Sequence, residues 1–303
     1  MSKHVAVILL SWNAKLYTEQ CIQSIKNHAS DNLYDIIVAD NGSTDNSILH
    51  LKKKFSDLIF IDNKINLGFA EGNNRALDFA SKKGYKYSLL LNNDTIITDD
   101  VIKKLYDYLE NNKHVAAVQP AIFELHNRQK LWNGEMDFNP IFGITYSKSK
   151  LPIEAKAVKW ITGCCFLIRN DVLKNTGMFN EKFFLYYEDV ELSFRIRAKG
   201  YQLNILPNAT IYHEAGTSGK LKNKSKEGYL NPIIHYYLTR NKIWFLKGYA
   251  SKWFYPIILL SLIAQITPLI CYFVIKGKKQ KLSNLVKGVV DGLFTSSKKI
   301  YQK

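Results

Sequence analysis

The sequence predicts an α/β protein in which a mostly parallel sheet carries helices on both faces. Short and almost entirely apolar runs predict buried strands, and stretches with helical spacing separate them. The runs lie at residues 5–10, 35–39, 58–61, 89–91 and 115–118. Strands that are apolar at nearly every position are typical of parallel sheets, which are buried on both faces. Strands that alternate with helices are joined by crossover connections, which place helices on both sides of the sheet.

The helices between these strands are predicted from apolar residues that recur every three or four positions. The positions that define their inner faces are Leu16, Cys21, Ile22, Ile25 and Ala29, then Leu77 and Ala80, then Ile102, Leu105 and Leu109. Another helix is expected to end near Phe55, with Ser43 or Thr44 placed to cap its start.

The second half of the chain has weaker patterns. Residues 120–159 show no period, and residues 158–168 and 210–212 predict further strands. Residues 190–198 alternate between apolar and polar, as a strand does. We nevertheless expect a helix there, because acidic residues precede the segment and Lys199-Gly200 follows it.

Composition describes an ordinary folded protein of 303 residues, with 47% hydrophobic and 22% charged residues. The net charge of +16 suits nucleic acid, anionic lipid or phosphorylated substrates. No zinc-finger spacing or RNP-like strand is present, so we expect no nucleic-acid partner. The four cysteines lack metal-binding spacing and predict reduced thiols. The apolar run at the start is too short for a secretory signal, so the catalytic part is expected in the cytoplasm.

Polar loops follow four of the predicted strands, at residues 11–13, 40–45, 66–74 and 92–94. The carboxyl ends of parallel strands share one edge of a sheet, so these loops can converge on one ligand. Asp40 can accept a hydrogen bond from a nucleobase, and Gly68 and Gly72 let a phosphate approach the backbone near a helix N-terminus. Neither a Walker loop nor GxGxxG is present, which argues against a nucleotide hydrolase or a dinucleotide oxidoreductase.

The run at residues 89–91 ends in Asn92, Asn93 and Asp94. One carboxylate flanked by amides is a weak metal site alone, although cations that hold phosphates often take only one or two protein carboxylates. The alternative is a turn before a helix cap at Thr98-Asp99.

Two further positions point to chemistry. Glu188 and Asp189 directly follow the mostly aromatic run at 183–187, and nearby apolar surface raises a carboxylate pKa and suits a general base. The alternative is an acidic helix start stabilised by the helix dipole. His213 ends a predicted strand and can join Asp94 on a metal, although a lone histidine is more often a surface or core residue.

Six motifs in order carry a family resemblance: VILLSWN, VADNGSTDNS, NLGFAEGNN, LLLNNDT, FFLYYEDVELSFR and YHEAGTS. With them, roughly residues 5–247 resemble the family-2 inverting glycosyltransferases, which have the GT-A fold. The most similar branch is the rhamnosyltransferase-like group that builds bacterial surface polysaccharides. The resemblance implies a Rossmann-like, mostly parallel sheet and a UDP- or dTDP-sugar donor, with rhamnose as the sugar the branch suggests.

The resemblance also implies residue roles. Asp189 of the Glu188-Asp189 pair matches the catalytic base, and Asp94 and His213 match the ligands of a divalent cation, Mn2+ or Mg2+. Asn92 departs from the family's DXD motif, in which the first residue is Asp, and this leaves Asp94 as the one carboxylate of the motif. The residues expected to contact the nucleotide-sugar are Ser11, Asn13, Asp40, Asn41, Gly68, Gly72, Asn73, Asn74, Asn92 and Asn93. The implied reaction is a single in-line displacement with inversion.

The C-terminal quarter contains a stretch without charged residues, 253–275, flanked on both sides by lysines. Its length suits a bilayer span, but basic flanks on both sides conflict with a single crossing. Because Pro256 and Pro268 interrupt the run, we expect a re-entrant or interfacial helical hairpin on anionic headgroups rather than one span. A buried core hairpin or a dimer contact is the remaining alternative. Upstream, residues 236–241 resemble the family's tyrosine-rich RN segment and predict a helix that closes the acceptor side.

We therefore expect a glycosyltransferase domain at 1–228, with a nucleotide-sugar half at 1–119 and an acceptor half at 120–228, followed by a basic, membrane-associating helical segment at 229–303. The expected acceptor is a lipid-linked saccharide at the cytoplasmic face of a bacterial inner membrane. Two other functions stay open. One is a sugar-nucleotide nucleotidyltransferase, and the other is a non-catalytic partner that holds a sugar nucleotide or glycan for another transferase.

Overall fold

The computed structural model describes residues 3–30, 32–214 and 219–301 and groups the chain into two compact units. The first unit comprises Met1–Asp137, Ser147–Glu181 and Glu188–Ala215. The second comprises Phe138–Tyr146, Lys182–Tyr187 and Gly216–Lys303. Each unit is therefore built from segments that are not contiguous in sequence.

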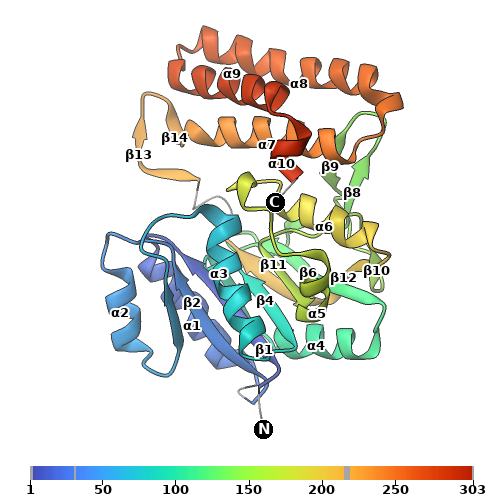
Figure 1. Cartoon of the computed structure of the whole chain (residues 1–303). Helices are drawn as coiled ribbons and strands as arrows, with labels where there is room; N and C mark the ends of the chain where they lie inside the picture. The colour runs from blue at the N-terminus through green and yellow to red at the C-terminus, as the bar shows by residue number, and fades with distance from the viewer. Residues whose placement is uncertain (1–2, 31, 215–218, 302–303) are drawn as a thin grey trace. The chain divides into compact units, whose positions relative to one another are not determined.

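The first unit is built on a large mixed sheet (Figure 1). Its strands are β1 (Val5–Ser11), β2 (Tyr34–Asp40), β3 (Ile59–Asp62), β4 (Tyr87–Leu91), β5 (Thr95–Ile97), β6 (Val115–Glu124), β7 (Leu131–Asn133), β10 (Lys156–Ala157), β11 (Cys165–Arg169) and β12 (Gln202–His213). The strand order is β10-β12-β6-β11-β4-β1-β2-β3, while β5 pairs with β12 and β7 with β6. Strands β3, β2, β1 and β4 are parallel, as are β6 and β12, whereas β11 runs antiparallel to β4 and β6.

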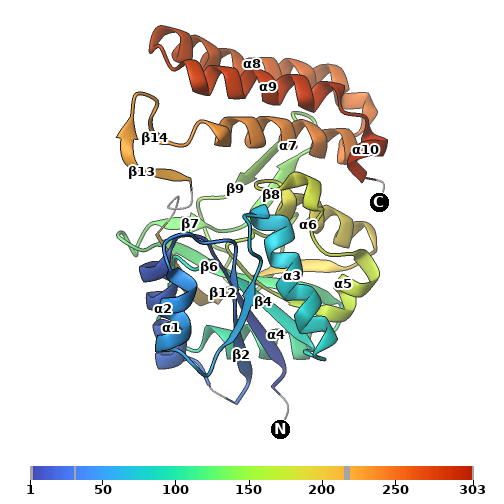
Figure 2. The ribbon, with the colours of Figure 1, turned by 60° about the vertical axis from the view of Figure 1, so that its left-hand side comes forward.

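Two hydrophobic cores cover the two faces of this sheet. The helices are α1 (Lys15–His28), α2 (Ser47–Lys54), α3 (Gly68–Lys82), α4 (Val101–Asn111), α5 (Asn170–Thr176) and α6 (Glu188–Ala198). Helices α1, α2 and α4 share one core with the odd-numbered side chains of β1, and α3, α5 and α6 share the other with its even-numbered side chains. Figure 1 shows α3 across one face, and Figure 2 shows α1 and α2 on the opposite side. The predicted fold class is confirmed.

Several predicted boundaries differ from the structure. Helix α2 begins at Ser47 after Asn46, and the side chains of Ser43 and Thr44 do not cap it. Asp100, one residue beyond the predicted Thr98-Asp99 cap, caps α4 by accepting from the backbone N–H of Lys103. The predicted strand at residues 158–168 is reduced to β11, and residues 188–198 form the expected helix α6.

The second unit contains most of the C-terminal helices. It includes α7 (Ile233–Tyr249), α8 (Tyr255–Ile275), α9 (Lys279–Phe294), α10 (Ser297–Tyr301), the short turn η2 (Lys252–Phe254) and the hairpin of β13 (Lys220–Ser225) and β14 (Gly228–Leu230). A further hairpin consists of β8 (Met136–Asn139) and β9 (Ile144–Ser147), and Phe138–Tyr146 of it belongs to the second unit. Helix α9 packs closely on α7, because a Cβ at Gly288 would lie 2.7 Å from the carbonyl oxygen of Tyr236.

Helix α8 corrects the expectation of a helical hairpin within residues 253–275, because the two prolines do not break the apolar run. Residues 255–275 form one continuous helix, with Pro256 in its first turn and Pro268 inside it. Proline is tolerated in a first turn because the missing N–H has no partner in the helix anyway. Among the described residues, Lys252–Ile275 is the one helical stretch long and apolar enough to cross a membrane. Only Ile258 and Phe273 of α8 are buried, so the alternative of a buried core hairpin is wrong.

Candidate active site

Two of the polar loops meet where β1 and β2 end. The register of the two strands places Ser11 opposite Asp40. Beyond them, the backbone N–H of Asn13 donates to Ser43 Oγ at 2.9 Å, and Asn13 Oδ1 accepts from the N–H of Thr44 at 2.8 Å. Asn13 therefore joins the first two loops, and the hydroxyl of Ser43 serves this link rather than a helix cap.

Asn41 joins the second loop to the third. Its amide nitrogen donates to the carbonyl of Gly68 at 3.0 Å, and its Oδ1 accepts from the N–H of Leu67 at 3.2 Å. The side chain is buried and its polar atoms are used within the protein. Asn41 thus shapes the start of α3, where Gly68 adopts a φ of 76°.

Asp40 has one carboxylate oxygen that no described residue satisfies. Oδ2 accepts from the N–H of Ser43 at 3.0 Å, while Oδ1 is buried without a hydrogen-bond partner in the described part of the chain. Buried polar atoms normally have partners, so an unsatisfied one points to a missing ligand. A nucleobase N–H is a donor of the kind that this oxygen lacks.

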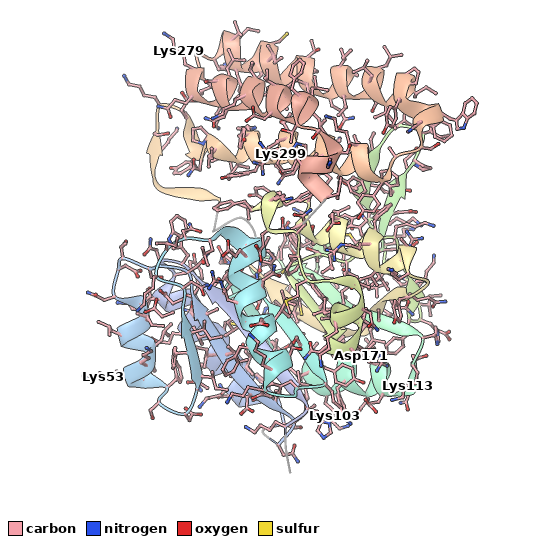
Figure 3. The ribbon with its side chains drawn as sticks, viewed as in Figure 1. Lys53, Lys103, Lys113, Asp171, Lys279 and Lys299 are labelled. Carbon is pink, nitrogen blue, oxygen red and sulfur yellow. The ribbon has the colours of Figure 1, made fainter. Side chains whose placement is uncertain are left out.

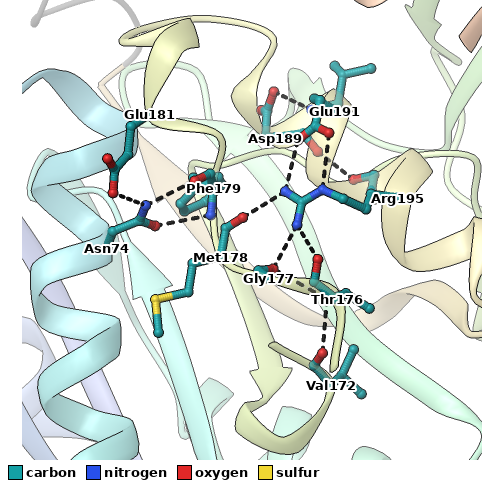
Figure 4. Close-up of polar contacts among 12 residues, drawn as sticks. Asn74, Val172, Thr176, Gly177, Met178, Phe179, Glu181, Asp189, Glu191 and Arg195 are labelled. Carbon is teal, nitrogen blue, oxygen red and sulfur yellow. Dashed lines mark hydrogen bonds and ion pairs between the residues drawn. The ribbon is translucent and has the colours of Figure 1, made fainter. Parts of the chain in front are cut away.

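Three expected donor-binding residues on α3, Gly72, Asn73 and Asn74, make contacts within the protein. A Cβ at Gly72 would lie 2.9 Å from Leu10 Cδ1, so this glycine lets the helix pack on β1. Asn73 donates to the carbonyl of Phe69 at 2.8 Å. Asn74 donates to the carbonyl of Phe179 and accepts from its N–H (Figure 4). These contacts give Gly72, Asn73 and Asn74 a packing role in the first unit, and their contact with the donor stays a prediction.

Asn93 and Ser11 also serve the interior of the loop cluster. The amide of Asn93 donates to Thr18 Oγ1 at 2.8 Å, and the hydroxyls of Thr18 and Ser11 lie 2.9 Å apart. Thr18 comes from α1, so it ties that helix to two loops. Asn92 is half-buried, and its carbonyl accepts from the hydroxyl of Thr95.

Asp94 and His213 lie together because β5 pairs with β12. The antiparallel register places Thr95 opposite His213, and the N–H of Glu214 donates to the carbonyl of Asp94 at 3.0 Å. As a result His213 Nε2 lies 3.1 Å from Asp94 Oδ1, and both side chains are buried. The ring of Trp132 packs edge-on against His213, with 4.4 Å between ring centres.

The pair fits a divalent cation in its donor set and spacing. In an octahedral site with ligand distances of about 2.1 Å, two adjacent ligands lie about 3 Å apart. One carboxylate and one imidazole supply two ligands, and no cluster of three or more His, Cys, Asp or Glu side chains occurs among the described residues. The remaining ligands must then come from substrate oxygens and water, as is usual for cations that bind phosphates.

Glu188 and Asp189 begin α6, and α6 holds the loop that precedes β11. Three successive backbone N–H groups of that loop donate to side chains instead of to a strand. Ile161 donates to Ser193 Oγ, Thr162 to Gln119 Oε1 and Gly163 to Asp189 Oδ2, at 3.1, 3.0 and 2.8 Å. This is why the predicted strand at 158–168 begins only at Cys165.

Arg195 holds α6 in place from its other end (Figure 4). Its guanidinium pairs with the buried Glu191 at 2.9 Å and donates to the carbonyls of Thr176, Gly177 and Met178. Such a fork uses the planar donor geometry of arginine, which lysine lacks.

Comparisons with known proteins agree with this geometry. The profile described as "Glycosyl transferase family 2" matches residues 6–177, more than half of the chain. The chain belongs to this family. It is 23% identical to the N-acetylglucosaminyl-diphospho-decaprenol L-rhamnosyltransferase of Mycobacterium tuberculosis, over 73% of this chain and 79% of that protein. It is 26% identical to rhamnosyltransferase WbbL of Escherichia coli K12, over 70% of this chain and 83% of that protein.

A solved structure supports the GT-A fold of this family-2 glycosyltransferase. The mannosyltransferase PcManGT of Pyrobaculum calidifontis, in complex with GDP-Man and Mn2+, superposes with a TM-score of 0.59 at 14% identity. The match covers 97% of this chain and 88% of that one. As a member of family 2, the protein is an enzyme of the inverting hexosyltransferase class that takes its sugar from a nucleotide-sugar.

The two acids at the start of α6 are not equivalent. Burial and the neighbouring charge of Asp189 raise the pKa of Glu188 well above its ordinary value, and Glu188 Oε2 has no hydrogen-bond partner in the described chain. Burial also raises the pKa of Asp189, but the N–H groups of Gly163 and Val190, each at 2.8 Å, stabilise its anion and lower the pKa again. We therefore assign the first ionisation of the pair to Asp189, while Glu188 keeps its proton.

The sequence patterns did not reveal several residues that build this site. Thr18 and Trp132 act through contacts with residues far away in the chain, and no local pattern marks them. Glu191 and Arg195 had a signal, since opposite charges four positions apart on a helix attract each other.

We expect Glu188→Gln to change how stability depends on pH. The folded pKa of Glu188 lies above the ordinary 4.5, so its contribution to stability is fully present below about pH 4.5 and is lost as pH rises through the folded value. The neutral glutamine lacks this loss. Urea unfolding at a series of pH values should show the variant gaining on the wild type by about 1.4 kcal/mol per pH unit across that interval. Parallel curves for the two proteins would contradict a protonated Glu188.

Proposed function

We propose that this family-2 glycosyltransferase moves a hexosyl or deoxyhexosyl group from a UDP- or dTDP-sugar to a lipid-linked saccharide, with inversion. This proposal rests on one observation, namely that the two acids at the start of α6 differ in protonation. Asp189 is the carboxylate whose anion two backbone N–H groups stabilise, beside a protonated neighbour. One base suits a single displacement, because no second carboxylate is needed as a nucleophile.

In the proposed reaction, Asp189 accepts the proton of the acceptor hydroxyl as that oxygen attacks the anomeric carbon. The bond between this carbon and the diphosphate oxygen breaks at the same time, and the nucleoside diphosphate leaves with the electron pair. Attack opposite the leaving group inverts the anomeric configuration. The raised pKa of Asp189 makes it a stronger base than an ordinary aspartate.

The donor site is proposed at the loop edge of the sheet. Asp40 Oδ1 accepts from the base, and Asp94 Oδ1 with His213 Nε2 would hold Mn2+ or Mg2+. A bound divalent cation supplies positive charge that stabilises the leaving diphosphate. The Mn2+ bound to PcManGT, a protein of the same fold, supports the choice of metal.

Two observations support a lipid-linked acceptor, namely the name of a relative and an apolar groove in the second unit. The mycobacterial relative is named for a diphospho-decaprenol acceptor and for rhamnosyl transfer, and this is the reason to keep rhamnose as the proposed sugar. In the second unit, an open groove of about 480 Å³ runs along α8 and is almost wholly apolar. Its lining residues are Phe142, Ile144, Ile257, Leu260, Ser261, Ala264 and Gln265.

Helix α8 is the proposed attachment to the cytoplasmic face of the membrane. Its apolar side chains are mostly exposed, including Leu260 at 66%, and Trp253 just before it is 92% exposed. Lysines stand at both ends of the helix, among them Lys252, Lys276 and Lys279, the last labelled in Figure 3. An apolar helix with basic ends suits an anionic bilayer, in which the lysines contact headgroups.

The first prediction from the proposed function concerns the donor. Purified full-length protein in detergent should release nucleoside diphosphate from one sugar in a panel of UDP-, dTDP- and GDP-sugars. Release should require Mn2+ or Mg2+ and fall to background in Asp94→Ala, because the cation loses a ligand. Asp107→Ala is the control, because the Asp107 side chain on α4 is 48% exposed and takes no part in the proposed site. Metal-independent release that Asp94→Ala leaves intact would contradict the metal site. Binding without release, restored by membrane extract, would show that the lipid acceptor is obligatory.

The second prediction concerns the base. Asp189→Asn should lower the rate of transfer by at least about 100-fold, as expected for loss of a general base. Donor affinity measured by calorimetry should stay unchanged, since Asp189 does not bind the nucleotide. Asp171→Asn, on the exposed surface of α5 (Figure 3), is the matched control. Loss of donor binding in Asp189→Asn would contradict its assignment as the base.

The third prediction concerns the membrane. The protein should float with vesicles that contain anionic lipid, and less with neutral ones or at high salt, because salt screens the lysines. The double variant Leu260→Glu/Ile263→Glu should lose binding, whereas Leu49→Glu, an equally exposed leucine on α2, should not. Extraction by alkaline carbonate would indicate peripheral attachment, and resistance to it would indicate a span. Equal flotation of all variants would contradict α8 as the attachment.

A further inference from the structure

The chain reaches Glu188 through a segment with an unusual backbone. Phe184, Tyr186 and Tyr187 have φ values of 63°, 69° and 67°. Residues with a Cβ, and bulky ones above all, disfavour this left-handed region. A glycine would adopt it without strain, yet three aromatic residues occupy it within four positions. Such conformations persist only where surrounding contacts hold them, and they concentrate at functional sites.

Asn241 of α7 holds the carbonyl groups of this segment. Its amide nitrogen lies 2.7, 2.9 and 2.8 Å from the carbonyl oxygens of Phe183, Leu185 and Tyr186. Its Oδ1 accepts from Arg240 Nε at 2.8 Å. Three acceptors around one nitrogen, and a donor at the oxygen, fix the orientation of the carboxamide. The side chain is fully buried, so water cannot replace these bonds.

Arg240 holds the same segment one residue earlier. Its Nη2 donates to the carbonyls of Lys182 and Phe183, at 3.0 and 3.1 Å. The guanidinium lies over the ring of Trp244, 4.1 Å from its centre. Among the ion pairs of the described residues none involves Arg240, so carbonyl oxygens and aromatic faces stabilise this buried cation.

Aromatic packing fixes the side chains of the segment as well. The ring of Phe184 stacks on Tyr237 with 5.0 Å between centres and 16° between planes. Tyr187 packs against Phe245, four positions after Asn241 on α7. Both the backbone and the side chains of the segment are therefore held by α7.

We propose that Arg240 and Asn241 are positioning residues for the catalytic base. They fix the path of residues 182–187, and the peptide bond after Tyr187 leads directly into Glu188 and Asp189. Without these contacts the residue that directly precedes Glu188 is no longer fixed, and the first turn of α6, which carries both carboxylates, loosens. This inference rests on the proposed role of Asp189, and it assigns Arg240 and Asn241 no contact with donor or acceptor. A displacement of about 1 Å at a reacting group can cost about 100-fold in rate.

The test compares Asn241→Ala with a matched control, Asn170→Ala, in the full-length protein. Asn170 is also a buried asparagine, whose amide donates to the carbonyl of Tyr85 at 2.7 Å. Limited digestion with chymotrypsin is the first readout, because the segment is rich in the Phe, Leu and Tyr residues that this protease cleaves. We expect rapid cleavage within residues 183–187 in Asn241→Ala only. The second readout is kinetic: kcat for transfer should fall about 100-fold with donor KM unchanged.

Each outcome decides a separate point. If residues 183–187 stay protected from chymotrypsin in Asn241→Ala, Asn241 does not fix the path of the segment. If the segment is cleaved while kcat is unchanged, Asn241 has no role in positioning the base. Arg240→Lys keeps the charge but loses the fork, and it serves as the second variant if Asn241→Ala does not fold. If the wild type turns over no nucleotide-sugar, the proposed function fails. The digestion pattern still reports whether Asn241 fixes the segment, so failure of this inference and failure of the proposed function are distinguishable.

Discussion

The antiparallel pairing of β5 with β12 is the constraint on which the rest of the site depends. A parallel sheet gathers loops at one edge, but this alone leaves Asp94 at the end of β4 with no imidazole nearby. The pairing of Thr95 with His213 brings in a residue from the far end of β12. In the proposed metal site, burial would strengthen the attraction of the carboxylate–imidazole pair for a cation, because charges interact more strongly where water is excluded.

The sequence predicted those parts of the fold that depend on local pattern. Each buried strand from β1 to β4 is a short apolar run, and each of the helices α1, α3 and α4 has one apolar stripe. The helix at Glu188 was predicted against its own alternation, because acidic residues before it and glycine after it agree with helix ends. The convergence of the polar loops was predicted as well, since it needs only parallel strands.

Other features could not be read from the sequence, because their causes are contacts between distant residues. The strand expected before Cys165 does not form, since Ser193, Gln119 and Asp189 take the N–H groups that a neighbouring strand would need. The apolar run at α8 looked broken, but one proline lies in the first turn and the helix continues past the other. The sequence alone does not show whether an asparagine contacts a ligand or joins two segments of the protein by hydrogen bonds.

Hydrogen bonding within the protein distinguishes buried polar residues that hold the structure from those that can contact a ligand. Asn41 and Asn241 have their amide groups bonded within the protein, so their substitution removes structure before it removes any ligand contact. In the described chain, Asp40 Oδ1 and Glu188 Oε2 lack partners. A buried oxygen without a donor costs free energy in the empty protein. For Asp40 a ligand can return that cost on binding, whereas Glu188 offsets its own by keeping a proton. The unsatisfied oxygen of Asp40 thus supports its proposed role in recognising the base, and the bonded oxygens of Asp189 support the assignment of the anion to this residue.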